Sequence, residues 1–400
     1  ASEEPVIEAQ LRRLVGNTAR GLSLPALAEP HLVRAASLWR EADPDDPRVI
    51  EVGLSIVLVW QALERDDDAA RLCAELELTS ARTLSRDDPL WWRVQHNKAF
   101  LWRHAGRLRD AEALYREVAA ANERLLGPDA GETVATLHNL GSLLLGLDEP
   151  EAARDVLEDA LLRARRAGHA DASTWQIADN LAEAWRELGE LERAAASHRD
   201  AMQGFEQLLG PDHELTLGCA YRLLKVLHRQ GEHGDMAVLA TDLLARCERA
   251  FGPEHRRTMD VLQAVAVAKL RSGDADGAVA ALRRAYEVLL RHLGPRHPSV
   301  FTAGQNLMSA RLEASDPAGA LAVGEQLVAA LGDDVATANL APSTVVGTWL
   351  ALARALVAAE RRDEASRAVD RGLAAGREGL PDGHPFVAGL EELRGELSRR

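Results

Sequence analysis

The sequence is poor in cysteine and in long apolar runs. Its three cysteines, Cys73, Cys219 and Cys247, are odd in number and far apart, so they form no evident disulfide or metal framework. A reducing cytoplasm fits this usage best. The first 16 residues hold no uncharged apolar run of signal-peptide length, and no stretch approaches 18 consecutive apolar residues. We therefore expect a soluble, cytoplasmic protein that does not enter a membrane.

Positive charge and aromatic residues are also scarce. The formal net charge is −15, and only three lysines occur among 400 residues. Non-specific binding to nucleic acid needs a basic surface, so we expect no nucleic-acid partner. Aromatic residues make up 4% of the chain, while alanine, leucine, arginine and glutamate dominate. This composition is typical of helical proteins, because these residues lose little entropy in a helix.

Motifs of catalytic and cofactor-binding sites are missing. The chain lacks GxxxxGK[ST], HExxH, CxxC, GxSxG and GxGxxG. The segment GDADGA at 273–278 resembles the start of a calcium loop but lacks the closing glutamate, so we interpret it as a turn between helices. We expect no catalytic residues, no metal and no cofactor, and hence no enzyme.

One loop recurs at a fixed period. The segment LLGPDHELTL begins at Leu208, and related segments begin at Leu125, Phe251 and Leu293. Four equivalent threonines follow one another at intervals of 41, 42 and 42 residues: Thr133, Thr174, Thr216 and Thr258. A fixed period between about 20 and 50 residues indicates a solenoid or array. A chain of this length is also too long for one compact core.

Each repeat predicts a pair of antiparallel amphipathic helices, because apolar residues recur at three- and four-residue spacing in two runs. Glycine stands at the turn, where a helix C-cap favours positive φ: Gly106, Gly189, Gly231 and Gly273. Small residues mark close helix crossings: Ala99, Gly141, Ala182, Ala266, Ala353, Ala111, Ala153, Ala194, Ala278, Ala320 and Ala365. Large core residues are expected at Trp60, Trp102, Trp185 and Trp349.

In the recurring loop, Gly-Pro ends the second helix, because proline cannot continue it. The histidine that follows, His213, His255 or His297, is expected in the turn with a structural role. Thr216 or Thr258 is then expected to cap or open the next helix.

These small residues, turn glycines and helix pairs resemble the tetratricopeptide repeat (TPR). The usual TPR period is about 34 residues, and the longer period with the loop LGPDHxxT resembles the kinesin-light-chain type. That type is also common in bacterial regulatory proteins, including arms of STAND-class NTPases. The resemblance covers roughly residues 45–400. It implies an all-α fold: a right-handed α-solenoid (superhelix) of about eight TPR helix pairs with N- and C-terminal capping helices.

Three segments follow from this alignment. Residues 1–44 are expected to form an N-terminal helical cap or a degenerate repeat. Residues 45–379 are expected to hold eight TPR units of about 42 residues. Residues 380–400 are expected to form a capping helix, whose terminal arginines would give the end of the stack a polar outer face.

The resemblance also implies a concave groove lined by the first helices. In TPR proteins of this type an asparagine on that face commonly clamps the main chain of an extended ligand. The matching residues are Asn97, Asn139, Asn180 and Asn306, while Ser55, Arg222, Ala264 and Ala351 replace it in other units. A carboxamide both donates and accepts, so it can pair with a peptide unit. Alternatively, these asparagines only bridge neighbouring helices.

The groove positions of TPR units two to six, residues 87–295, carry a net charge of +3. Seven basic residues, Arg93, Arg103, Arg186, Arg222, Lys225, Arg229 and Arg271, stand against Asp179, Glu183, Glu187 and Asp260. The histidines His96, His104, His138 and His228 add neutral or partly protonated donors. Because Arg222, Lys225 and Arg229 follow at i, i+3 and i+7, we expect them to converge on one anionic group beside Tyr221. The alternative is a solvated face of helix-supporting ion pairs.

We therefore expect a non-catalytic scaffold or adaptor that binds a protein or extended peptide. The peptide would be acidic or carboxylate-terminated and would lie along units two to five. A second hypothesis is a sensor that binds a small molecule or peptide and changes shape. A third is a detached sensor arm of a STAND-type signalling NTPase, since the chain starts abruptly at Ala1. The sequence leaves the partner's identity and the oligomeric state open.

Overall fold

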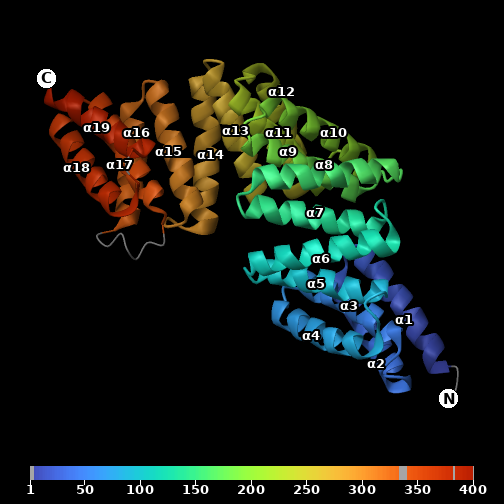
Figure 1. Cartoon of the computed structure of the whole chain (residues 1–400). Helices are drawn as coiled ribbons and strands as arrows, with labels where there is room; N and C mark the ends of the chain where they lie inside the picture. Colours follow the sequence, from blue (N-terminus) through green and yellow to red (C-terminus); the bar gives the residue numbers. More distant parts are fainter. Residues whose placement is uncertain (1–3, 333–339, 382, 400) are drawn as a thin grey trace. The chain divides into compact units, whose positions relative to one another are not determined.

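The computed structural model describes residues 4–332, 340–381 and 383–399. Within these ranges the chain forms 19 α-helices and no strand (Figure 1), which confirms the predicted all-α solenoid. None of the helices in these ranges has the length and apolar character that a membrane crossing requires.

The helices divide into two compact units, Ala1–Gly204 and Phe205–Arg400. From α1 to α9 each helix packs against the next one in the chain. Its helices are α1 (Glu4–Gly21), α2 (Pro25–Ala42), α3 (Pro47–Ala62), α4 (Asp66–Thr83), α5 (Pro89–His104), α6 (Leu108–Leu126), α7 (Gly131–Gly146), α8 (Pro150–Arg166), α9 (Ala172–Glu187) and most of α10 (Leu191–Leu209).

The second unit continues the same alternation of helices. It comprises the end of α10, followed by α11 (Glu214–Gln230), α12 (His233–Phe251), α13 (Arg256–Arg271), α14 (Ala275–Leu293), α15 (Pro298–Glu313), α16 (Pro317–Leu331), α17 (Pro342–Ala358), α18 (Arg362–Gly379) and α19 (Pro385–Ser398). From α3 to α18, the first helices of successive pairs begin 41 to 44 residues apart.

Small residues allow the two helices of a pair to approach closely. All ten alanines predicted at helix crossings have no exposed surface. Gly141 on α7 is the most constrained of the set, because a Cβ added there would lie 2.4 Å from Leu157 Cγ on α8. The crossing positions predicted from the sequence are therefore confirmed.

The recurring loop ends one helix and starts the next through a histidine. Gly210 closes α10 with a φ of 93°, and His213 is the N-cap of α11, where its Nδ1 accepts a hydrogen bond from Leu215 N at 3.2 Å. Thr216 was expected to cap or open this helix; it lies in the first turn of α11, and the cap is His213. The buried hydroxyl of Thr216 donates to the carbonyl of Gly210 at 2.9 Å and fastens the loop to the preceding helix.

The same arrangement recurs one period later. His255 caps α13 by accepting from Arg257 N, and Thr258 donates to the carbonyl of Gly252 at 2.8 Å. The GDADGA segment is a helix turn as expected, because the Asp274 carboxylate caps α14 by accepting from Gly277 N at 2.9 Å.

The tryptophan rings at these positions lie close to the charged groups of basic side chains. Trp185 is buried, whereas Trp60, Trp102 and Trp349 are half-buried. The guanidinium of Arg107 lies 4.2 Å from the centroid of the Trp102 ring, and Arg65 lies 4.9 Å from that of Trp60. These tryptophans are thus structural, but three of the four sit at the edge of the core.

Candidate binding site

The asparagines of the first unit join neighbouring helix pairs. Asn139 Nδ2 on α7 donates to His96 Nε2 on α5 at 3.0 Å. Asn180 Nδ2 on α9 donates to His138 Nε2 on α7 at 2.9 Å, whereas Asn97 Nδ2 donates to the Arg93 carbonyl on its own helix. The bridging role considered above thus holds for Asn139 and Asn180. Within the described part of the chain, neither Oδ1 atom accepts a hydrogen bond.

The bridging histidines are neutral. An amide nitrogen can only donate, so His96 Nε2 is an acceptor, and Nδ1–H donates to Thr136 Oγ1 at 3.0 Å. Burial lowers the pKa of His96 to about 4, and burial together with Arg103 lowers the pKa of His138 to about 4. These two rings therefore supply no positive charge at neutral pH.

The predicted basic residues of the first unit are engaged in different ways. Arg186 pairs with Glu183 at 2.6 Å and with Glu187, as the ion-pair alternative requires. Arg103 Nη2 donates to Ser142 Oγ at 3.0 Å. Arg93 is exposed and lines a small pocket of about 120 Å³ together with Asn97 and other residues of α5 to α7.

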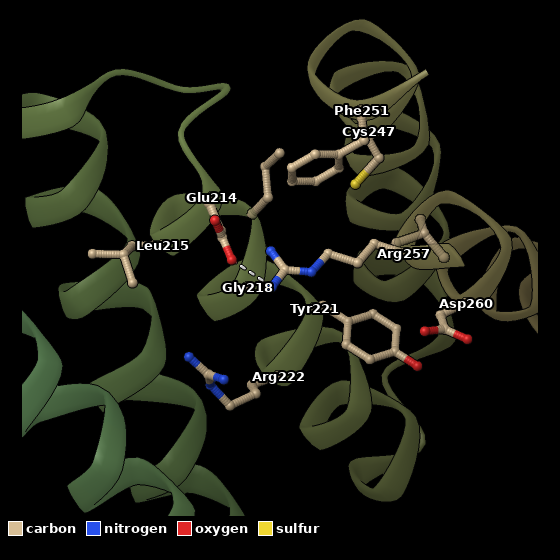
Figure 2. A pocket seen from close by; sticks show the side chains of 11 residues that line it. Glu214, Leu215, Gly218, Tyr221, Arg222, Cys247, Phe251, Arg257 and Asp260 are labelled. Atoms are coloured by element: carbon tan, nitrogen blue, oxygen red, sulfur yellow. Dashed lines mark hydrogen bonds and ion pairs between the residues drawn. The ribbon is translucent and has the colours of Figure 1, made fainter. Parts of the chain in front are cut away.

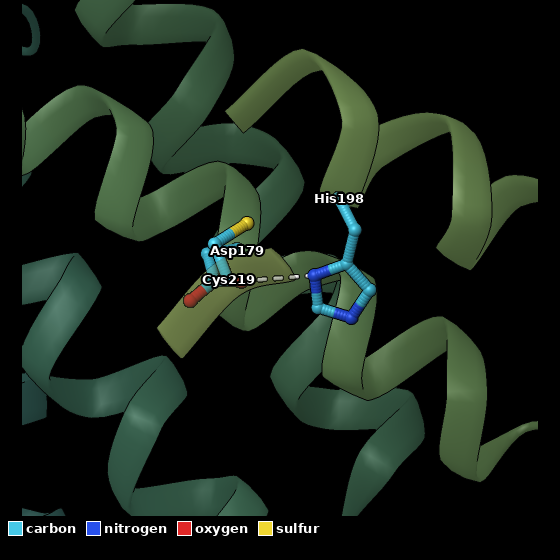
Figure 3. A group of neighbouring side chains, drawn as sticks. All are labelled: Asp179, His198 and Cys219. Carbon is cyan, nitrogen blue, oxygen red and sulfur yellow. Dashed lines mark hydrogen bonds and ion pairs between the residues drawn. The ribbon is translucent and has the colours of Figure 1, made fainter. Parts of the chain in front are cut away.

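One acidic residue that was counted in the groove is in the interior. Asp179 on α9 is only 3% exposed. Its carboxylate accepts a hydrogen bond from His198 Nδ1 on α10 at 2.8 Å (Figure 3). Sequence reasoning missed this pair, because His198 lies outside the recurring loop and the groove positions.

The second unit holds a pocket of about 280 Å³ between α11, α12 and α13 (Figure 2). Apolar side chains form much of its wall: Leu215, Leu217, Phe251 and Val261. Polar and charged side chains complete it: Glu214, Tyr221, Arg222, Arg257 and Asp260, with Cys247 and Gly218 between them. A mostly apolar pocket with a few charged groups is typical of a ligand site.

Charges of both signs meet in this pocket. Arg257 reaches from α13 to Glu214 on α11, with Nη2 and Oε1 2.5 Å apart (Figure 2). Lys225 Nζ lies 4.7 Å from the centroid of the Tyr221 ring. Burial raises the pKa of the Asp260 carboxyl, and burial together with Asp260 raises the pKa of the Tyr221 hydroxyl.

The pocket depends on a glycine at position 218. A Cβ added there would meet only Arg222 Nη2, at 3.8 Å. Because Gly218 itself lines the pocket, we expect a longer side chain at this position to occupy pocket space. In contrast, a Cβ at Gly304 on α15 would lie 2.8 Å from Leu327.

The structure brings together part of the predicted set. Tyr221 and Arg222 line the pocket and Lys225 stacks on Tyr221, but Arg229, two turns beyond Arg222, is not a lining residue. Sequence reasoning missed Glu214, Phe251 and Arg257. A signal for the last two existed, because both flank the recurring loop that precedes α13.

These helix pairs, with their recurring loop and small crossing residues, define a repeat solenoid. Models of the tetratricopeptide repeat match residues 93–166, 176–214 and 258–299. The chain contains tetratricopeptide repeats. No curated protein matches it in sequence.

Solved structures show the same fold at low sequence identity. RapI in its apo form is 11% identical, with 98% of each chain covered and a TM-score of 0.65. The STAND protein with a tetratricopeptide repeat sensor from Pyrococcus horikoshii is 12% identical, with a TM-score of 0.67 over 97% of this chain and 55% of its own. BtubC (BKLC) from P. vanneervenii is 19% identical, with a TM-score of 0.50 over 59% of this chain and 95% of its own.

Proposed function

We propose that the chain is a non-catalytic scaffold or adaptor that binds an acidic or carboxylate-terminated segment of a partner protein. TPR folds typically serve as binding scaffolds. The observation that carries the proposal is the pocket between α11 and α13, which joins apolar walls to Tyr221 and Arg222 and has Lys225 beside it.

The pocket suits a segment with one apolar side chain and a nearby anion. Leu215, Phe251 and Val261 contact the apolar group, while the planar guanidinium of Arg222 pairs bidentately with a carboxylate. Lys225 and Arg229, one and two turns further along α11, add positive charge. The first unit offers a separate candidate surface, where the Oδ1 atoms of Asn139 and Asn180 can accept from main-chain N–H groups of an extended peptide and where Asn97 and Arg93 line a small pocket.

Asp260 gives this site a pH dependence. Its carboxyl lies in the same pocket, and burial holds its pKa above the ordinary value of 3.8. An ionised Asp260 repels a bound carboxylate, whereas a protonated one can donate to it. Affinity for an anionic segment therefore rises as the pH falls through the raised pKa, and an Asp260→Asn variant binds more tightly at neutral pH.

The test compares two labelled peptides that are rich in Asp and Glu and end in leucine, one with a free carboxylate and one amidated. Fluorescence anisotropy should show tighter binding of the free carboxylate and weaker binding as salt increases. The double variant Arg222→Glu/Arg229→Glu should lose at least about tenfold in affinity while keeping its helical circular dichroism. Arg283→Glu, an exposed arginine on α14, is the matched control. Equal binding of both peptides by all three proteins contradicts the proposal.

A sensor is the second candidate. The likeness to a STAND protein with a TPR sensor and to RapI favours it. A sensor changes shape when its ligand binds, and a scaffold does not. X-ray scattering of the full chain, with and without saturating peptide, separates the two: a shifted profile favours the sensor, and an unchanged profile with proven binding favours the scaffold.

A further inference from the structure

A second pocket of the unit Phe205–Arg400 lies between α16, α17 and α18. Its volume is about 250 Å³, which is the share of about eight water molecules in the liquid. Apolar side chains form its floor: Val328 on α16, Leu352 and Leu356 on α17, and Ala368 on α18. This pocket shares no lining residue with the pocket between α11 and α13, so the two can be occupied independently.

The charged side chains of this pocket leave two cations without an acidic partner. Arg361, the N-cap of α18, pairs with Glu325 at 3.5 Å and with Glu364 at 2.6 Å. One guanidinium thus holds both carboxylates that line the pocket. Arg367 and Arg371 line it one turn apart on α18, and neither forms an ion pair with a described residue. The pocket therefore has an excess of positive charge.

An aromatic ring positions one of these cations. The guanidinium carbon of Arg371 lies 5.4 Å from the centroid of the Trp349 ring, which also lines the pocket. The face of an indole ring attracts a cation without using its N–H groups. Within the described part of the chain, those N–H groups of Arg371 have no hydrogen-bond acceptor, so they remain available to a ligand.

Helix packing does not account for the other cation. Ala365 on α18, Ala320 on α16 and Ala278 on α14 are equivalent crossing residues with no exposed surface. Two residues after each of them stands Arg367 on α18, but an alanine on α16 and on α14. The second helix of a pair therefore packs without an arginine at this position, and Arg367 is a feature of this pocket rather than of the repeat.

We propose that this pocket binds a carboxylate that carries a small apolar body. The body contacts the apolar floor, and the carboxylate accepts hydrogen bonds from Arg367 and Arg371, whose planar guanidinium groups suit it. A cationic ligand would meet three guanidinium groups, and both acidic side chains that could attract it are already paired with Arg361. Charge complementarity thus selects an anion. The proposal is independent of the function proposed for the pocket between α11 and α13.

Isothermal titration calorimetry with phenylpropionate tests this site. The Arg222→Glu/Arg229→Glu variant serves as the background, so that the pocket between α11 and α13 does not bind the carboxylate. Phenylpropionate should bind this variant with one-to-one stoichiometry and at least about tenfold more tightly than its neutral amide. Phenylpropylamine, which has the same body but a positive charge, should bind more weakly than the amide.

A peptide distinguishes the two sources of such a carboxylate. An acetylated tetrapeptide that ends in phenylalanine carries the same ring beside a terminal carboxylate. Binding as tight as that of phenylpropionate assigns the site to the carboxyl end of a polypeptide, whereas weaker binding assigns it to a free acid.

Substitution of the two arginines locates the binding. Arg367→Gln/Arg371→Gln, added to the same background, should lower the affinity for phenylpropionate at least about tenfold while the helical circular dichroism is kept. Arg354→Gln/Arg377→Gln, at exposed positions of α17 and α18 outside the pocket, is the matched control and should bind as the background does. Undiminished binding by the Arg367→Gln/Arg371→Gln variant overturns the proposal. Equal binding of carboxylate and amide by the unaltered pocket overturns it equally, even if that variant fails to fold.

Discussion

Several histidines of this chain act as hydrogen-bond acceptors. His213, His255 and His297 cap helices by accepting a backbone N–H at Nδ1. His96 and His138 accept a side-chain amide at Nε2. Protonation of His96 or His138 at Nε2 would remove the lone pair that accepts from the asparagine.

This predicts a loss of stability on mild acidification. The pKa values of His96 and His138 are lowered from 6.5 to about 4 in the folded chain, so the neutral ring is preferred there. The stability that this preference contributes is complete above about pH 6.5 and is lost as the pH falls toward 4. At pH 5 the loss reaches about 2 kcal/mol for each histidine.

The variant His96→Gln/His138→Gln isolates this effect. Glutamine keeps an acceptor for Asn139 and Asn180 but does not titrate. Urea unfolding at pH 7.5 and pH 5 should show a smaller drop in the free energy of unfolding for the variant than for the wild type. Equal drops in the two proteins would mean that other groups carry the acid sensitivity.

The role of a residue could be predicted from the sequence where that role depends on side-chain size within one helix pair. The alanines at helix crossings follow from the repeat alone, and each is buried as expected. The roles of His96 and Asn139 were not predictable with the same ease, because each depends on which side chain the next repeat presents. The spacing of the asparagines is compatible with binding a ligand and with bridging two helices. The sequence pattern did not show that the histidine one period earlier is the hydrogen-bond partner of the asparagine.

At the scale of the element, the crossing positions set helix separation. Ala182 on α9 has no exposed surface. Replacing it with leucine inserts three carbon atoms into a filled crossing and should cost about 1–3 kcal/mol. Thermal unfolding should show a lower Tm for Ala182→Leu. Ala196→Leu, at an exposed position of α10, should leave the Tm close to that of the wild type. An unchanged Tm for Ala182→Leu would contradict the assigned crossing.

The paired helices were predictable, but the pocket was not. Apolar periodicity, turn glycines and the Gly-Pro loop each act within one helix pair. The pocket, in contrast, needs side chains from three helices and a missing side chain at Gly218. Tyr221, Arg222 and Lys225 could be predicted as site residues because their spacing places them on one helix. Phe251 and Arg257 come from other elements, and although the recurring loop passes through both positions, its pattern does not show that they face the same pocket.

At the scale of the whole molecule, each helix contacts chiefly the next one or two in the chain. Stability should then behave as a sum of repeat and interface terms. Deleting residues 212–253 joins Pro211 to Glu254 and restores a Gly-Pro-Glu-His loop at the junction. The shortened chain should remain soluble and helical and unfold cooperatively when followed by circular dichroism. Loss of all cooperative unfolding would contradict the modular account.

The central claim is that the pocket between α11 and α13 binds the partner's acidic segment, and the variant Gly218→Leu tests it most directly. Gly218 lines the pocket, and a Cβ there would meet only Arg222 Nη2 at 3.8 Å, so we expect a leucine to occupy pocket space. Leucine also suits a helix better than glycine by about 0.5–1 kcal/mol. Gly234→Leu, at an exposed and open position of α12, is the matched control. In a titration with the carboxylate peptide, Gly218→Leu should bind at least about tenfold more weakly although its Tm equals or exceeds that of the wild type. Undiminished binding by Gly218→Leu would contradict the account.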